Sequence, residues 1–248
     1  MHILKVKDKA ALGKTAAELL IQSCTPRFNA LVALPTGSTP APLYAHLRGR
    51  YVAGEQDFSS THFTQLDEYC GLTHDDPRSF AGWLSRELLN PLNIPADHRL
   101  MMDGTANPAQ EAVRIEDTIR AHGGRLDMAI LGLGENGHLA FNEPGTAFDS
   151  RTHRVRLTEE TRESNALYWG DIDLVPQEAL TLGLGTIMDA HEIVLLVSGD
   201  SKAEALRETV TRTPSPDFPA SCLQLHKNVT VIADEPASRL LPDSLNLA

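Results

Sequence analysis

Cysteines, long apolar runs and basic residues are all scarce in this sequence. The three cysteines, Cys24, Cys70 and Cys222, are odd in number and far apart, which excludes a disulfide framework and a zinc knuckle. No apolar run approaches the length that spans a membrane, and the amino terminus lacks the charged-then-apolar pattern of a signal peptide. We therefore expect a cytoplasmic protein with no membrane partner.

Acidic residues outnumber basic ones: 33 Asp and Glu stand against 22 Lys and Arg, which gives a formal net charge of −11. Nucleic acids and anionic membranes bind basic faces, so this balance argues against both as partners. A small anionic ligand stays compatible, because it needs only a local positive potential. With 248 residues, 42% of them hydrophobic and 22% charged, the composition is that of a soluble globular protein.

Apolar runs of strand length alternate with helical patterns along the whole chain. The predicted strands are 2–6, 29–34, 61–66, 98–102, 126–132, 153–157, 191–198 and 228–233. The predicted helices are 9–23, 39–50, 78–89, 107–122, 176–189 and 201–212. This alternation predicts an α/β fold with a Rossmann-like, predominantly parallel sheet and helices on both faces.

No repeat, low-complexity tract or linker divides the chain, so we expect residues 1–248 to form a single domain. The segment 145–175 is polar and weak in periodicity, and we interpret it as a surface excursion or a lid. The proline-rich stretch 213–219 is predicted to be a loop.

A glycine-rich stretch, residues 131–145, directly follows the apolar run 126–131 and holds His138 and Glu143 between its glycines. Ligands of open α/β sheets bind beyond the carboxyl ends of the strands. Two titratable groups on a flexible backbone at such a place predict a catalytic loop.

The same stretch matches the dinucleotide pattern G-x-G-x-x-G at Gly132, Gly134 and Gly137. A true fingerprint opens a long helix early in the chain, whereas this one lies past mid-chain and Asn142 and Pro144 soon interrupt any helix. We therefore expect no nicotinamide or flavin cofactor.

The stretch 34–40 leaves a predicted strand and opens a predicted helix. Thr39 suits the N-cap position of that helix and Pro40 its first turn. Gly37 lets the backbone turn so that N–H groups point outward, and Ser38 adds a hydroxyl. The sequence fits an anion site and a plain capped helix equally well.

Two further strand ends hold charged residues. Asp67 and Glu68 end the strand 61–66, and we assign Asp67 as a general base and Glu68 as a structural cap. No His or Cys ligand accompanies them, so we expect no metal. Lys202 opens a helix, where the dipole disfavours a cation unless an anion binds there, although a solvated lysine is equally compatible.

All four loops lie at the carboxyl ends of predicted strands, where a single site is assembled. They provide an anion cradle, a carboxylate, a His–Glu pair and a lysine. This set of groups predicts acid–base chemistry on a phosphorylated small molecule.

The chain resembles the glucosamine-6-phosphate deaminase (isomerase) family over most of its length. The similar stretches are 34–40, 66–72, 132–144, 175–185 and 221–226, of which Asn-Gly-His-Leu-Ala-Phe-Asn-Glu-Pro at 136–144 is the most specific. The related 6-phosphogluconolactonases usually read Asp-Glu-Arg in place of Asp-Glu-Tyr at 67–69, and Asp-Gly-His-Thr-Ala at 136–140. Both differences favour the deaminases.

The resemblance implies that an amino-sugar phosphate ring is opened, isomerised from aldose to ketose and deaminated to fructose 6-phosphate, without a cofactor. It implies that His138 protonates the ring oxygen while Glu143 holds the imidazole and raises its pKa. Asp67 moves a proton between C2 and C1, and Asn136 completes the catalytic set. The implied phosphate-binding residues are Thr36, Gly37, Ser38, Thr39 and Lys202.

Three departures from the family pattern bear on these expectations. Many members have Asp at Asn136, and Asn cannot share a proton with His138. Leu167 occupies the place of a lid arginine that grips phosphate, so either Arg162 or another cation replaces it, or phosphate affinity and substrate choice differ. The residues that bind an N-acetylglucosamine 6-phosphate effector are also missing, with His153 and Val155 at their places, so we expect no activation by that effector.

The sequence is compatible with several substrates and functions. The substrate is a phosphorylated amino sugar, with glucosamine 6-phosphate first and galactosamine 6-phosphate second. A lactonase-type hydrolysis or a non-catalytic sugar-phosphate-binding domain would fit the same fold. A homo-oligomer is possible.

Overall fold

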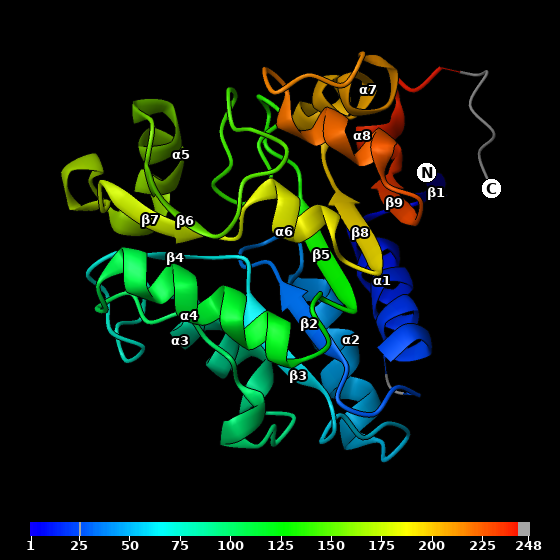
Figure 1. Ribbon diagram of the computed structural model, residues 1–248. Helices are drawn as coiled ribbons and strands as arrows, with labels where there is room; N and C mark the ends of the chain where they lie inside the picture. Colours follow the sequence, from blue (N-terminus) through cyan, green and yellow to red (C-terminus); the bar gives the residue numbers. More distant parts are fainter. Residues whose placement is uncertain (25, 243–248) are drawn as a thin grey trace.

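A six-stranded, fully parallel sheet forms the centre of the computed structural model, which describes residues 1–24 and 26–242 (Figure 1). The strands follow the order β1-β9-β8-β5-β2-β3. Their bounds are β1 (His2–Val6), β2 (Leu31–Leu34), β3 (His62–Gln65), β5 (Met128–Gly132), β8 (Glu192–Val197) and β9 (Val229–Asp234).

A second, smaller sheet is antiparallel and adjoins the first. It has the order β4-β7-β6, with β4 (Asp67–Tyr69), β7 (Glu178–Thr181) and β6 (His153–Arg156). Only Leu66 separates β3 from β4, so the chain passes from one sheet directly into the other. Asp67 is therefore placed at the point where the two sheets meet.

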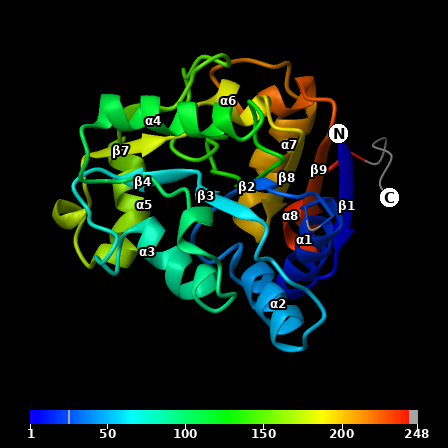
Figure 2. The ribbon, with the colours of Figure 1, turned by 60° about the horizontal axis from the view of Figure 1, so that its bottom comes forward.

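Helices cover both faces of the main sheet (Figures 1 and 2). The helices are α1 (Lys9–Cys24), α2 (Ala41–Val52), α3 (Phe80–Leu84), α4 (Pro108–Ala121), α5 (Glu159–Trp169), α6 (Leu184–Met188), α7 (Ala203–Thr211) and α8 (Glu235–Ser238). A π-helical turn (Ser85–Leu89) continues α3, and 3₁₀ turns cover Ala96–His98, Ile172–Leu174, Asp200–Lys202 and Pro219–Leu225. Within the described residues, no helix is both long and apolar enough to cross a bilayer.

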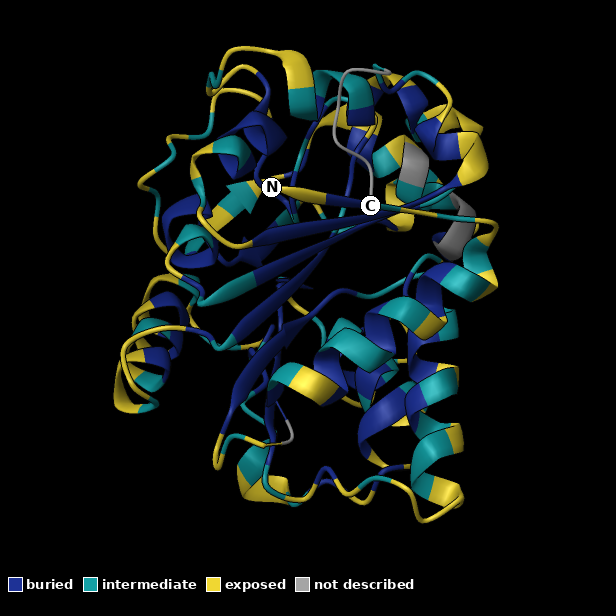
Figure 3. Ribbon diagram, turned by 90° about the vertical axis from the view of Figure 1, so that its right-hand side faces the viewer, coloured by how far each residue is buried: buried dark blue, intermediate teal, exposed yellow. Residues whose placement is uncertain are grey.

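Side chains of the central strands alternate between two apolar cores, one on each face. Ala129 and Leu131 of β5 pack with α4, α6 and α7, whereas Met128 and Ile130 pack with α1, α2 and α3. Both faces of the sheet are buried as a result, as the dark strands at the centre of Figure 3 show. This explains why the strands read in the sequence as unbroken apolar runs.

The fold class predicted from the sequence, a single α/β domain with a mostly parallel sheet, is confirmed. Two element assignments are wrong. Residues 98–102 form only an isolated bridge between Arg99 and Phe63, and the predicted helix 176–189 is split into β7 and the short α6. Pairing of β7 with β4 and β6 outweighs the local helical pattern there.

Two segments contain regular structure that the sequence did not predict. The polar segment 145–175 contains α5 besides β6, which matches the predicted strand 153–157, and the end of the predicted loop 213–219 opens the 3₁₀ turn Pro219–Leu225. α5 begins at Thr158, whose hydroxyl accepts from the Thr161 N–H, and ends at Gly170 with a φ of 81°. Its first turn and its end therefore follow ordinary capping rules, although its hydrophobic period is weak.

The strand order reverses between β2 and β5. After β2 the chain adds β3 on one side, then crosses back to place β5 on the other side of β2. The loops after two such neighbouring strands turn in opposite directions, which opens a crevice between them. Ligands of doubly wound sheets bind in this crevice. The fold thus places the loop after β2 and the glycine-rich loop after β5 around one opening.

Close packing of α1 on α2 gives a first testable prediction. A Cβ on Gly13 would lie 2.4 Å from the Cβ of Pro42, whereas a Cβ on Gly49 of α2 would meet nothing within 4 Å. We expect Gly13→Ala to lower the free energy of unfolding by about 1–3 kcal/mol in urea denaturation. Gly49→Ala, the matched control, is expected to raise it by up to about 1 kcal/mol. Equal effects of the two substitutions would contradict this packing.

Candidate active site

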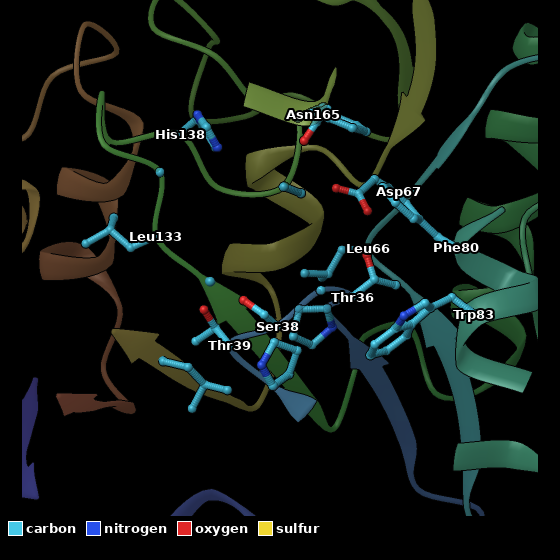
Figure 4. A pocket seen from close by; sticks show the side chains of 18 of the residues that line it. Thr36, Ser38, Thr39, Leu66, Asp67, Phe80, Trp83, Leu133, His138 and Asn165 are labelled. Atoms are coloured by element: carbon cyan, nitrogen blue, oxygen red, sulfur yellow. The ribbon is translucent and has the colours of Figure 1, made fainter. Parts of the chain in front are cut away.

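A cavity of about 560 Å³ opens at the carboxyl ends of β2, β3, β5 and β8. Figure 4 shows Ser38 and Thr39 along one side of it, with Asp67 and His138 facing the space from opposite sides. Seven of the nine residues that we predicted from the sequence line this cavity: Thr36, Gly37, Ser38, Thr39, Asp67, His138 and Lys202. The other two, Asn136 and Glu143, lie behind His138 and contact it.

Asp67 begins β4, and its carboxyl group points into the cavity (Figure 4). Only 9% of the residue is exposed, and within the described parts of the chain no group donates a hydrogen bond to its carboxylate. Burial, together with the negative charge of Glu68, raises the pKa of Asp67 to about 8. A carboxyl group with this proton affinity is suited to take up and return protons near neutral pH.

His138 belongs to a hydrogen-bonded chain of three side chains. Its Nδ1 lies 2.8 Å from Asn136 Oδ1, and Asn136 Nδ2 donates to Glu143 Oε2 at 2.9 Å. Because the same Asn136 oxygen also accepts from the backbone N–H of His138, it acts as an acceptor and Nδ1 carries the proton. The neutral imidazole therefore keeps its lone pair on Nε2, the nitrogen not engaged by Asn136.

Glu143 stands one step further from the imidazole than the sequence suggested, with 3.7 Å between its Oε2 and His138 Nδ1. Its second oxygen accepts from the hydroxyl of Thr161 on α5. Burial lowers the pKa of His138, Glu143 raises it and Lys202 lowers it, and the net result is a lowered pKa. Glu143 thus raises the pKa of His138, as expected, but the loss of hydration on burial outweighs its effect.

Close approach of backbone and side chain explains one glycine of the loop. A Cβ on Gly134 would lie 2.4 Å from ring atoms of His138, so any other residue would displace the imidazole. The N–H of Gly134 donates to the carbonyl of His138 at 3.0 Å and closes the loop. Gly134 thus serves to position the histidine, and in the part of the chain that the structure describes no helix directly follows this loop.

Four residues that the sequence assigned to an anion site line the cavity, namely Gly37, Ser38, Thr39 and Lys202. Gly37 has a φ of 97°, which turns the chain sharply after β2. Thr39 is not the N-cap, because α2 starts at Ala41 with Pro40 in the capping position and no side-chain cap. The Thr39 side chain is thus not committed to capping the helix.

Lys202 closes a 3₁₀ turn just ahead of α7 rather than lying in the first turn of a helix. Its side chain is 28% exposed, and its Nζ lies 3.5 Å from Glu135 Oε1. The ammonium group therefore borders the cavity with one partly solvated acidic partner, and an anion in the cavity would be its second.

The cavity also includes residues that the sequence reading did not select, namely Arg78, Phe80, Trp83, Asn165 and Trp169. The guanidinium of Arg78 stacks over the Trp169 ring at 4.4 Å and pairs with Asp76, linking the loop before α3 to α5. None of these residues follows the end of a strand. The one sequence signal for this part of the cavity was Pro77-Arg78-Ser79, which precedes a capped helix. The Arg78 guanidinium is therefore part of the cavity wall.

Arg162, which we expected as a replacement for the missing lid arginine, is turned elsewhere. Its Nη2 donates to the carbonyl of Ile172 at 2.7 Å, and it does not line the cavity. The side chain of Leu167, at the place of that arginine, lies outside the described residues. Arg78 and Lys202 are the arginine and lysine of the cavity wall in the described part of the chain.

Metal binding was not expected from the sequence. In the described residues, no group of three or more His, Cys, Asp or Glu side chains is arranged to hold a metal ion.

Comparison with known proteins places the chain among sugar-phosphate enzymes. Residues 7–232 match the family described as glucosamine-6-phosphate isomerases/6-phosphogluconolactonase. A glucosamine-6-phosphate deaminase of Bacillus pumilus is 39% identical over 97% of this chain and 100% of its own length. One from Shouchella clausii is 39% identical over the full length of both chains.

Solved structures show the same relationship. A monomeric glucosamine-6-phosphate deaminase superposes with a TM-score of 0.93 at 38% identity, over 97% of this chain and 100% of its own. The 6-phosphogluconolactonase of Trypanosoma cruzi gives a TM-score of 0.77 at 21% identity, over 96% of each chain. The second likeness concerns the fold alone.

The raised pKa of Asp67 predicts how its replacement affects stability. A carboxyl group ionises near pH 4 in the unfolded chain, whereas Asp67 ionises at about 8 in the folded one. Its contribution to stability is full below the unfolded pKa and is lost as pH rises through about 8. We therefore expect Asp67→Asn to raise the thermal unfolding midpoint relative to wild type, and more so at about pH 8.5 than at about pH 5.5.

The change between these two pH values should be on the order of 2 to 3 kcal/mol, and each kcal/mol shifts the midpoint by about 2–4 °C in a chain of this size. Asp76→Asn is the control, because Arg78 lowers the pKa of Asp76 to about 2 and its charge is constant over this range. A pH-independent difference for Asp67→Asn would show that the carboxyl is ionised throughout.

Proposed function

This chain belongs to the family of glucosamine-6-phosphate isomerases and 6-phosphogluconolactonases, and we propose that it is a glucosamine-6-phosphate deaminase. The enzyme converts glucosamine 6-phosphate and water into fructose 6-phosphate and ammonia. Relatives of this name are about 39% identical over nearly the whole chain, whereas the solved lactonases are far less similar. One observation carries the proposal: Asp67, the hydrogen-bonded His138 and the phosphate-binding candidates with Lys202 all line the same cavity.

Ring opening is the first step that the geometry supports. His138 Nδ1 is held by Asn136, so Nε2 is the nitrogen that exchanges a proton with the sugar. The neutral Nε2 takes the proton of the C1 hydroxyl and passes it to the ring oxygen as the bond from C1 to that oxygen breaks, which leaves an aldehyde at C1. The lowered pKa of His138 makes its imidazolium a strong proton donor.

Isomerisation and deamination then need one base and one water molecule. The Asp67 carboxylate takes the proton from C2, the C2–H electron pair forms a C1–C2 double bond, and the aldehyde oxygen takes up a proton from water. Asp67 returns its proton to C1, and the electrons move so that C2 becomes an iminium. Water adds to C2 and ammonia leaves, which yields the ketose. Every step is a proton transfer or a hydrolysis, so the reaction requires no redox cofactor.

The phosphate is assigned to Thr36, Gly37, Ser38, Thr39 and Lys202. Backbone N–H groups and hydroxyls of the loop after β2 offer donors, and Lys202 adds a positive charge at the same cavity. Anchoring the phosphate fixes C1 and C2 relative to Asp67, which converts binding energy into orientation.

The proposal includes three finer points. The segment 145–175 acts as a lid, because its α5 places Asn165 and Trp169 in the cavity wall and its Thr161 on Glu143. The enzyme is cytoplasmic. Its substrate is an amino-sugar phosphate. The enzyme works as a monomer or as a homo-oligomer, and the solved relative is described as monomeric.

Ammonia release tests the proposed function directly. Purified protein is offered glucosamine 6-phosphate and galactosamine 6-phosphate separately, and we expect ammonia from the first sugar at the higher kcat/KM. Asp67→Asn should lower kcat by at least about 10³-fold, since it removes the only proposed base. Hydrolysis of 6-phosphogluconolactone without ammonia release would replace the deaminase assignment with a lactonase.

Lys202→Gln tests the phosphate site. Losing one charge-assisted contact costs roughly 1.5–3 kcal/mol, so KM for glucosamine 6-phosphate should rise about tenfold or more with a smaller change in kcat. The inhibition constant of inorganic phosphate should rise in parallel. Arg207→Gln is the control, because Arg207 pairs with Glu204 and Glu208 on the surface of α7. A Lys202→Gln variant with unchanged KM would move the phosphate to the other cation, Arg78.

A further inference from the structure

Two consecutive carboxylates, Asp67 and Glu68, occupy opposite environments in β4. Successive side chains of a strand point to opposite sides, so Asp67 faces the cavity and Glu68 faces the start of α3. Glu68 is fully buried. It takes no part in the proposed mechanism, yet a buried charge is costly unless it is compensated.

Glu68 is saturated with hydrogen-bond donors. Its Oε1 accepts from the backbone N–H of Tyr69 at 2.9 Å and of Phe80 at 3.1 Å. Its Oε2 accepts from the N–H of Ala81 at 2.9 Å, the hydroxyl of Ser79 at 2.8 Å and the amide of Gln65 at 3.3 Å. Gln65 is itself fixed, because its oxygen accepts from the N–H of Met102. Burial raises the pKa of Glu68, and these hydrogen bonds act against that rise because donors around both oxygens stabilise the charged form of a carboxyl group.

Asp67 has the reverse surroundings, with no donor to its carboxylate among the described residues. One of these adjacent carboxylates accepts several hydrogen bonds and the other accepts none from the described residues, so their proton affinities differ. The proton goes to Asp67 and the negative charge stays on Glu68.

We propose that Glu68 is a positioning residue for the proton transfer between C2 and C1, and that its fixed negative charge makes the neighbouring Asp67 a stronger base. This inference rests on the proposed function for its catalytic part, while the charge relation between the two acids stands on the geometry alone. Capping of α3 by Glu68, as the sequence suggested, is the means by which that charge is held in place.

The other charged groups around Asp67 do not take over this role. Arg78 is paired with Asp76, Lys202 with Glu135, and burial lowers the pKa of His138. On the side of Glu68, the nearby Cys70 is a neutral thiol, because burial and Glu178 raise its pKa to about 11. Glu68 is therefore the constant negative charge nearest to the base.

The pH dependence of kcat/KM tests the proposal, because it reports groups of the free enzyme. In the wild type, activity should fall as pH decreases through about 8, where Asp67 takes up its proton. Glu68→Gln removes the charge and should shift this acid limb to lower pH by about one unit or more, with a lower alkaline plateau. Glu68→Asp keeps a charge and should retain the wild-type limb. A Glu68→Gln limb at the wild-type pH, or an equal shift in Glu68→Asp, overturns the proposal.

A second measurement uses the wild-type protein and needs neither substrate nor a folded variant. Carbon-13 NMR of the two side-chain carboxyl carbons should show Glu68 charged throughout the pH range in which Asp67 titrates. A Glu68 that takes up its proton first contradicts the proposal. If the wild type releases no ammonia but the two titrations are as expected, the proposed function fails and the charge relation stands.

Discussion

All six strands of the main sheet run in one direction, and this constraint determines where the proposed catalytic and phosphate-binding loops lie. Parallel strands bring their carboxyl ends to one edge, and the reversal of strand order between β2 and β5 opens a crevice there. Residues from four distant stretches, Ser38, Asp67, His138 and Lys202, meet at that crevice. The two apolar cores hold the sheet rigid from both sides, so the loops are presented by a firm support.

Electrostatics within the crevice depends on unequal solvation of like groups. Asp67 and Glu68 are neighbours in one strand, but the pleat sends one to the cavity and the other to a ring of donors at α3. Similarly, Glu143 lies 3.7 Å from His138 and is also linked to it through the amide of Asn136, yet burial dominates the pKa of the imidazole. A strong base and a strong acid result from placing the same residue types in different surroundings.

Much of the fold and of the site could be predicted because the signals are local. Apolar runs bounded by turn residues marked all six strands of the main sheet, and the glycines around His138 marked the catalytic loop. Residues 98–102 and 176–189 were misread because strand pairing with distant segments decides their state. Arg78, Trp83 and Trp169 were missed since they reach the cavity from α3, the loop before it and α5, away from any strand end.

The sequence by itself determined the α/β class, the four loops that meet at the site and the residue types available there, because hydrophobic period and turn chemistry are properties of short segments. The tertiary structure alone decided the antiparallel second sheet, the amide between Glu143 and His138 and the cation–aromatic contact of Arg78 with Trp169. It also decided which of two adjacent acids keeps its charge. Proton affinity depends on donors and burial supplied by residues far along the chain, and no local pattern encodes them.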